Sequence, residues 1–406
     1  MKKRYLVSIA LLLALIALVL MPACTKSTTP PGQKSIKVGM IGWLGWPLGL
    51  DMVHGVEIMS DADNKAGGLN IGGEKYKVEL VYYDSKADQS TAVAAANKLI
   101  FEDKVQYILG DSQFVDAWFP IADKNKVISI FQAVTQEAES TQYHYAFDGP
   151  YMNAQNCVLP GWFAKTYPQD KDIAVALPDT QMGHAQAPTV EAAFKIFGFT
   201  VTTIYYPPDQ QDQSALGTKV KTLNPGAFTA LAGGPIGDGL CFKAAYQAGY
   251  RGQFFASNAA PLLSLEQVIP IEALEGFINM AWPVEFDDPP TEQAKVFKAA
   301  YIAKYGKWDG PDIIDTANYA LLRTALQKAG STDVDKVAAA ISNGLEYEGP
   351  TGKGKMIDRP DLGQTRTVDS ICSYYFKKIE NGKPVNIYNV SLDEALGYFR
   401  QAFPTK

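Results

Sequence analysis

Two polar loops carry groups that could hold an anion. One is Gly110–Gln113 and the other is Gln132–Glu137, and each follows a short apolar run and leads into a helical segment. Hydroxyl groups at such a place, together with the free N–H groups that open a helix, favour a negatively charged ligand. The candidate ligand contacts in these loops are Ser112, Gln113, Ala133 and Thr135. The alternative role for Ser112 and Thr135 is that of an ordinary helix N-cap.

Aromatic residues gather near the same loops. Trp43 and Trp46 follow an apolar run at 36–42, and tryptophan offers a broad, rigid surface to an apolar or aromatic ligand. The alternative is that one or both pack into the protein. The further aromatic residues expected near the ligand are Phe114, Trp118, Phe147 and Tyr151, of which we take Tyr151 as a candidate contact.

The sequence contains no recognisable motif for catalysis or metal binding. His54, His144 and His184 are scattered and lack the spacing of a zinc site. A Gly-x-Ser-x-Gly nucleophile motif is missing. The segment 349–355 comes near a phosphate-binding P-loop, but Met356 stands where Ser or Thr must bind Mg²⁺. We therefore expect a β-turn there, and a protein with no metal, no cofactor and no enzymatic activity.

The elements that must position these residues alternate along the chain. Strands are expected at 36–42, 76–83, 105–109, 127–131, 172–177, 200–205, 228–232 and 253–256. Helices are expected at 49–65, 90–102, 117–125, 153–167, 187–197, 216–223, 240–248, 292–305, 313–328 and 334–342. The segments 352–357, 370–379 and 385–389 are typical of antiparallel strands. This alternation predicts an α/β protein with two successive parallel sheets, each covered by helices on both faces.

Length and charge limit the function further. A chain of 406 residues exceeds the size at which one core stops growing, so two lobes are expected. The net charge is −6, and removal of a leader containing Lys2, Lys3 and Arg4 leaves 34 basic and 43 acidic residues. Such an acidic chain is unsuited to nucleic acid or to the surface of an anionic membrane, because both are bound mainly through Lys and Arg.

The N-terminus predicts export. The basic residues 2–4 precede the apolar run Leu6–Leu20, which is short for a membrane span and right for a signal peptide. Ala23-Cys24 resembles the end of a lipobox, although Met21 and Pro22 depart from that pattern. We expect a signal peptide at 1–23, a lipidated Cys24 and a flexible tether at 24–35. Secretion without lipid, or a retained N-terminal anchor, is the alternative.

The ordered motifs of the chain resemble the branched-chain amino-acid-binding type of periplasmic binding protein. They are Ile36–Gly42, Asn64–Leu69, Tyr83–Ser85, Ala92–Ile100 and Gly349–Gly352. The resemblance implies a type I fold, in which two Rossmann-like lobes are joined by a three-strand hinge with a ligand cleft between them. It implies a first lobe at 36–147 plus 276–345 and a second at 148–275 plus 346–400.

The resemblance also implies roles for single residues. Ser112 and Thr135 match the positions that hold the ligand carboxylate in the family. Asn258 matches an acidic residue that holds the ligand ammonium, and Met182 a position that is often Tyr. A buried ammonium needs a carboxylate partner, so an uncharged Asn258 favours an apolar or aromatic carboxylate over a free amino acid. A branched-chain amino acid is the alternative ligand.

These expectations describe the substrate-binding subunit of an ABC importer at the cell envelope, which delivers a small ligand to a membrane permease. The alternatives are a ligand-sensing subunit for a membrane receptor and an exported enzyme. After lipidation of Cys24, three cysteines remain, an odd number that leaves their pairing open: Cys157, Cys241 and Cys372.

Overall fold

The structure is a computed structural model, in which one compact unit extends from Ser35 to the C-terminus. It describes residues 33–45, 47–110, 114–132, 142–149, 152–169, 171–256, 265–308, 313–364 and 366–404. The expected signal peptide and most of the expected tether lie outside these ranges. Within them, every helix is too short or too polar to cross a membrane.

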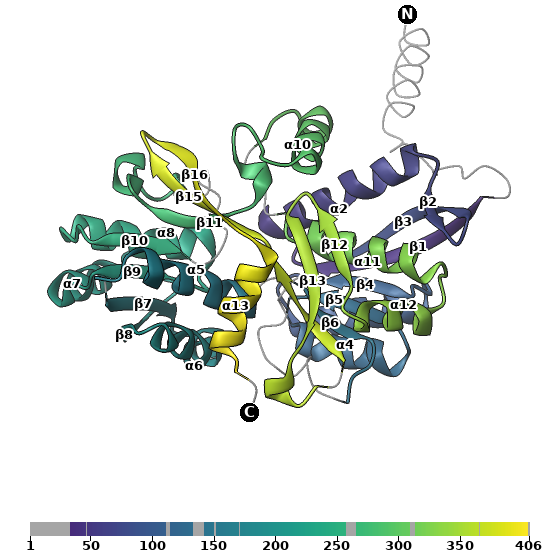
Figure 1. Cartoon of the computed structure of the whole chain (residues 1–406), viewed down its shortest axis with the longest axis horizontal. Helices are drawn as coiled ribbons and strands as arrows, with labels where there is room; N and C mark the ends of the chain where they lie inside the picture. The colour runs from purple at the N-terminus through teal and green to yellow at the C-terminus, as the bar shows by residue number, and fades with distance from the viewer. Residues whose placement is uncertain are drawn as a thin grey trace, which may run out of the picture. The chain divides into compact units, whose positions relative to one another are not determined.

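A six-stranded sheet forms the first half of the fold (Figure 1). Its strands in spatial order are β2 (Leu69–Ile71), β3 (Glu74–Asp84), β1 (Lys34–Gly42), β4 (Tyr107–Gly110), β5 (Ile128–Phe131) and β6 (Ala146–Asp148). The pairs from β1 through β4 and β5 to β6 are parallel, whereas β2 and β3 form an antiparallel hairpin. The connecting helices are α2 (Pro47–Lys65), α3 (Gln89–Phe101) and α4 (Val115–Lys124).

A seven-stranded sheet forms the second half. Its strands in spatial order are β16 (Lys383–Val390), β15 (Tyr374–Glu380), β11 (Ile278–Ala281), β10 (Gln253–Ala256), β9 (Ala227–Ala230), β7 (Asp172–Pro178) and β8 (Thr200–Tyr206). Strands β7 to β11 pair in parallel, and β15 and β16 add an antiparallel edge. The helices of this half are α5 (Met152–Thr166), α6 (Gln181–Ile196), α7 (Ser214–Leu223) and α8 (Gly234–Gln247).

The last third of the chain joins the two halves. Helices α10 (Glu292–Tyr305), α11 (Asp315–Ala329) and α12 (Val334–Ser342) precede a three-stranded antiparallel sheet of β12 (Glu346–Gly349), β13 (Gly352–Asp358) and β14 (Thr367–Cys372). Helix α13 (Leu392–Ala402) ends the described fold. The turn between β12 and β13 falls on Pro350 and Thr351, as expected for the segment that comes near a P-loop.

The chain passes between the two halves three times. It leaves the six-stranded sheet after β6, returns after β11 to α10, which packs on α2, and passes from β14 to β15 through Ser373 alone. Residues 370–379 are thus two strands in two sheets, where we expected one. Strand β11 lies in the seven-stranded sheet although it falls in the segment 276–345 that we expected in the first lobe, because its four residues carry no pattern that tells the sheets apart.

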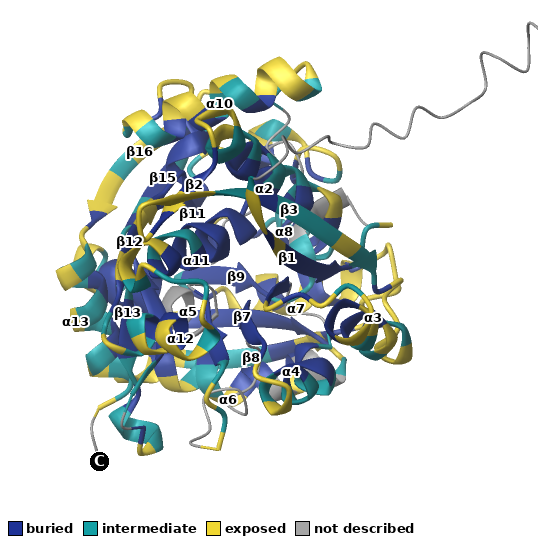
Figure 2. Ribbon diagram, turned by 90° about the vertical axis from the view of Figure 1, so that its right-hand side faces the viewer, coloured by how far each residue is buried: buried dark blue, intermediate teal, exposed yellow. Residues whose placement is uncertain are grey.

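Burial is greatest in the central strands of the two large sheets (Figure 2). All four residues of β4, β5, β9 and β11 are buried, as expected for parallel strands covered on both faces. Phe163 of α5 stacks on Phe255 of β10 at 4.9 Å between ring centroids.

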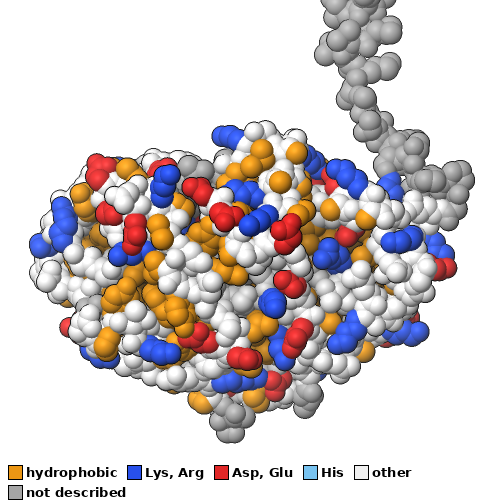
Figure 3. Space-filling model, turned by 45° about the horizontal axis from the view of Figure 1, so that its top comes forward, with side chains coloured by type: hydrophobic (Ala, Val, Ile, Leu, Met, Phe, Trp, Pro, Cys, Tyr) orange, Lys and Arg blue, Asp and Glu red, His pale blue; other side chains and the backbone are white. Residues whose placement is uncertain are grey.

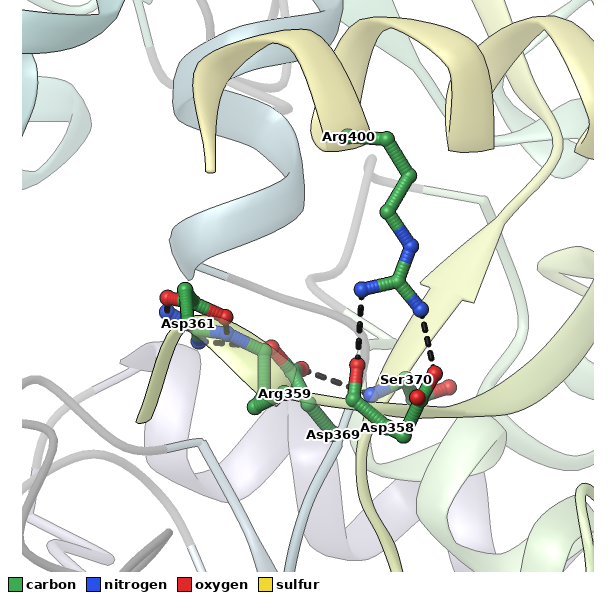
Figure 4. A network of polar contacts seen from close by, with 6 residues as sticks. All are labelled: Asp358, Arg359, Asp361, Asp369, Ser370 and Arg400. Atoms are coloured by element: carbon green, nitrogen blue, oxygen red, sulfur yellow. Dashed lines mark hydrogen bonds and ion pairs between the residues drawn. The ribbon is translucent and has the colours of Figure 1, made fainter. Parts of the chain in front are cut away.

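A buried arginine organises the C-terminal region (Figure 4). Arg359 is fully buried and pairs with Asp361 at 2.8 Å and with Asp369 at 3.1 Å. Its guanidinium also lies over the Phe403 ring, 4.7 Å from the centroid. Two carboxylates and a ring face compensate the cost of burying the charge, so the end of β13, β14 and the segment after α13 are held together.

Candidate ligand-binding site

Each parallel sheet has one place where the strand order reverses. In the six-stranded sheet β1 lies between β3 and β4, and in the seven-stranded sheet β7 lies between β8 and β9. Ligands of open α/β sheets bind beyond the carboxyl ends of the strands at such a switch point. The candidate site is therefore made by the loops after β1 and β4 in one half and after β7 and β9 in the other.

A helix begins directly after each of these four strands. Helix α2 follows β1, α4 follows β4, α6 follows β7 and α8 follows β9. The first turn of each helix has N–H groups without a partner inside the helix and carries the positive end of the helix dipole. The four strand ends thus favour an anionic group.

The loop after β1 is fixed by the end of β3. The amides of Leu44 and Lys86 both donate to Oδ1 of Asp84, at 3.0 and 2.8 Å, and the Ser85 amide donates to the Gly42 carbonyl at 2.8 Å. Trp43 is half-buried in this loop. A Cβ added to Gly49 would lie 2.2 Å from the Trp43 carbonyl oxygen, so α2 approaches the loop at a distance that only glycine permits.

A small cavity lies under this loop. It has a volume of about 10 Å³ and is lined by Gly42, Leu44 and Asp315, among other residues. That volume holds about one water molecule. The cavity is therefore too small to receive a solute.

Two of the expected aromatic residues belong to the core instead. Trp118 is fully buried and makes an edge contact with Phe131 at 5.7 Å. A Cβ on Gly110 would lie 2.6 Å from its ring, so the indole fills the space behind β4. Phe147 is also fully buried. Both rings are thus part of the packed core, whereas Phe114, before α4, is half-buried.

Buried polar groups anchor the end of β5. Oδ1 of Asp315 accepts from Asn318 at 2.8 Å and from Gln132 at 3.4 Å. The Gly149 amide donates to the Phe131 carbonyl at 2.5 Å, and a Cβ on Gly149 would lie 2.1 Å from Oδ1 of Asn318. The first turn of α11 therefore fixes the point where the chain enters the second polar loop.

The loop after β7 presents charged and aromatic groups that we did not predict. The Asp179 amide donates to the Tyr206 carbonyl at 2.8 Å, and its carboxylate contacts His184 Nε2 at 2.7 Å. The His184 ring stacks on Tyr205 at 4.1 Å. The Asp179 and His184 side chains are 63% and 53% exposed, so both are open to solvent at the strand end.

Thr180 begins α6 by accepting a hydrogen bond from the Gly183 amide at 3.1 Å. The expected contact Met182 therefore lies in the first turn of α6, directly after β7.

The loop after β9 was also missed. Ala232 and Gly234 have left-handed backbone angles, with φ of 67° and 69°, and the Gly233 amide donates to Asp238 at 3.0 Å. Burial, reinforced by the Asp238 carboxylate, raises the pKa of Tyr206 well above its usual range. The sequence contained a signal for this helix start, because Gly-Gly-Pro follows the expected strand at 228–232 and Gly-Pro commonly opens a helix.

Most of the predicted contacts lie outside the described residues: Cys24, Trp46, Ser112, Gln113, Ala133, Thr135, Tyr151 and Asn258. Of the predicted set, the structure places Trp43 at the β1 end and Met182 at the β7 end. The predicted contacts all remain predictions. In the described part of the chain, no three His, Cys, Asp or Glu side chains are placed to share a metal ion.

Two α/β halves, each with a switch point lined by helix N-termini, define a two-lobed solute-binding protein. The sequence matches the periplasmic binding protein family over residues 35–377, and the chain belongs to this family. It is similar to the leucine-, isoleucine-, valine-, threonine- and alanine-binding protein of Pseudomonas aeruginosa, with 27% identity over 337 residues that cover 81% of this chain and 87% of that protein.

Solved structures share the fold. A leucine-binding protein from Thermotoga maritima is 23% identical, with a TM-score of 0.71 over 88% of this chain and 99% of that one. A solute-binding protein of an ABC transporter from R. palustris, in complex with 4-hydroxybenzoate, is 22% identical, with a TM-score of 0.71 over 90% and 99%.

These similarities confirm the expected two-lobed α/β fold. Membership of the periplasmic binding protein family makes the chain an extracytoplasmic solute-binding protein and confirms that it is not an enzyme.

Proposed function

We propose that this protein captures a small apolar or aromatic carboxylate between its two lobes and delivers it to the permease of an ABC importer. The observation that carries the proposal is the set of four helix N-termini at the two switch points. A carboxylate gains from free N–H groups and from the positive ends of the helix dipoles. The apolar part of the ligand would contact aromatic side chains such as Trp43.

The proposed contacts are those predicted from the sequence. Ser112 and Thr135 would donate to the carboxylate, with Gln113 and Ala133 beside them. Trp43, Trp46 and Tyr151 would enclose the apolar part, and Met182 and Asn258 would close the site from the second lobe. The 4-hydroxybenzoate complex of the R. palustris protein is an example of such a ligand on the same fold.

An amino acid is the second candidate, and one observation favours it. Asp179 stands exposed at the end of β7 and could pair with an ammonium group, a role for which Asn258 has no charge. The P. aeruginosa relative is named for binding five aliphatic or small amino acids. The two candidates differ in whether the ligand needs a cationic group.

A panel of ligands distinguishes the carboxylate candidate from the amino-acid candidate. Thermal unfolding and calorimetry of the mature protein with benzoate, 4-hydroxybenzoate, leucine and valine would be compared with unfolding of the Asp179→Asn variant. We expect stabilisation by the aromatic acids, unchanged in the variant. Stabilisation by leucine alone, lost in the variant, would establish the amino-acid candidate in place of our proposal.

We also propose that Cys24 carries a lipid that holds the protein on the outer face of a membrane, with residues 24–35 as tether. Mass spectrometry of the mature N-terminus would identify the modification, and Cys24→Ser should release the protein from membranes. A sensory role is tested by co-purification, since an importer subunit should bring down permease subunits and a sensor a receptor.

A further inference from the structure

A second pocket lies on the first half of the fold, away from the strand ends. It has a volume of about 270 Å³ and is formed mainly by α2 and α10, with Arg323 of α11 also in its wall. Its nearest α2 residue, Ile58, is eleven residues beyond Pro47, which is roughly 16 Å along the helix. The pocket is therefore distinct from the candidate solute site.

The walls of the pocket are mainly apolar, and Glu292 and Gln293 of α10 are the polar residues that this helix adds to the lining. Ile58, Met59 and Ala62 of α2 face Val296 and Phe297 of α10 across it. Val296 is 59% exposed, the largest fraction among the exposed large hydrophobic residues described. Figure 3 shows apolar side chains among charged ones on the upper middle of the surface, where Figure 1 places α10. A mainly apolar hollow of this kind is suited to the apolar part of a small ligand.

The pocket has one cationic group. Within the described residues, the Arg323 guanidinium makes one ion pair, an Nη1 contact of 3.5 Å to Oδ1 of Asp63. The other oxygen of Asp63 already accepts from the Tyr319 hydroxyl at 2.9 Å. The Arg323 side chain is 26% exposed, so most of its five N–H donors are left to bind an added carboxylate, which arginine prefers to hold through two bonds.

Size sets the ligand class. An apolar cavity of about 150 Å³ suffices for benzene, so 270 Å³ accepts a benzene-sized group with a short arm. We propose that this pocket is a second ligand site for small arylalkyl or alkyl carboxylates, with the apolar group between α2 and α10 and the carboxylate on Arg323. This site is independent of the solute site and of the ligand that the solute site takes.

Methionine methyl groups report on the two sites separately. Met59 lines the pocket, Met52 lies beside the loop after β1, and Met356 is buried in β13. Mature protein labelled with ¹³C at the methionine methyls would be titrated with 3-phenylpropionate and, separately, with the uncharged 3-phenylpropanol. We expect the Met59 signal to shift and saturate, with the alcohol bound about fivefold more weakly because it cannot pair with Arg323.

Variants test each part of the proposal. Ala62→Trp places an indole in the pocket from an exposed position and should abolish the Met59 shift, while Ala299→Trp, an exposed position on α10 outside the pocket, should not. Arg323→Gln should make the acid and the alcohol bind equally. An unchanged Met59 signal, a response at Met52 alone, or a Met59 shift that persists in Ala62→Trp would overturn the proposal. Met356 should stay fixed throughout, as evidence that each variant is folded.

Discussion

Lys377 of β15 and Glu285, which follows β11, form an ion pair inside the protein, with side chains only 1% and 6% exposed. The other carboxylate oxygen of Glu285 accepts from the Trp282 amide at 2.7 Å. The pair thus ties β15 to the segment through which the chain leaves the seven-stranded sheet for α10.

Loss of one partner of the Lys377–Glu285 ion pair should strongly reduce the stability of the protein. Glu285→Gln keeps an acceptor for the Trp282 amide but removes the negative charge beside the buried Lys377, and we expect a loss of about 3–5 kcal/mol in the free energy of unfolding. Urea unfolding measures it. The exposed pair Lys295–Asp288 is the control, since Asp288→Asn should cost below ~1 kcal/mol. Equal losses in the two variants would contradict the prediction.

Asp84 should control the loop that carries Trp43. Asp84→Ala removes the acceptor shared by the Leu44 and Lys86 amides, and we expect a loss of about 1 kcal/mol in stability with several-fold weaker solute binding. Asp84→Asn keeps an oxygen at this place and is the matched variant. Calorimetry with the ligand found by the panel, and tryptophan fluorescence, measure the effect. Identical behaviour of the two variants would show that the acceptor has no role.

Asp88 should make α3 sensitive to acid. It caps α3 by accepting from the Thr91 amide at 2.7 Å, and hydrogen bonds from Ser90 and Thr91 lower its pKa to about 2. Because the pKa is about 4 in the unfolded chain, the stabilisation is complete above pH ~4 and is lost as the pH falls toward 2. Asp88→Ala should therefore unfold at a lower temperature than the parent at pH 7 and at the same temperature near pH 2. A constant difference across this range would refute the role of the ionised cap.

The three described cysteines should resist thiol reagents. Cys157, Cys241 and Cys372 are buried and unpaired with one another, and burial raises the thiol pKa, to about 12 for Cys372. Because only the thiolate reacts, Ellman's reagent should label none of them in the folded mature protein and all three in denaturant. One thiol in denaturant, without reductant, would mean that two of them form a disulfide.

Periodicity and capping residues made most of the fold predictable. The helices 292–305 and 334–342 agree with α10 and α12 to the residue, because a capping Thr291 or Asp333 precedes each. Helices α6 and α8 begin six residues before the expected 187 and 240. We placed the starts of these two helices too late because Gly183 and the Gly-Gly-Pro at 233–235 are equally typical of loops.

Three strands were not predicted, β2 and β6 with three residues and β11 with four, and pairing with neighbours in space defines them. The location of the candidate site, at the carboxyl ends of strands, was predicted from the sequence. Asp179 and Gly233 were not predicted as part of the site. The order of strands in the sheet places the switch point at β7 and β9, and local sequence patterns do not reveal that order.

Ser373 is all that separates β14 from β15, and it is held to Lys353 by its own amide at 2.8 Å and by its hydroxyl at 3.1 Å. One residue supplies only two soft torsions. At this one of the three crossings, any swing of one sheet against the other must therefore change these two torsions or move β13 together with β14. A glycine in place of Ser373 would allow a wider range of torsions at this crossing.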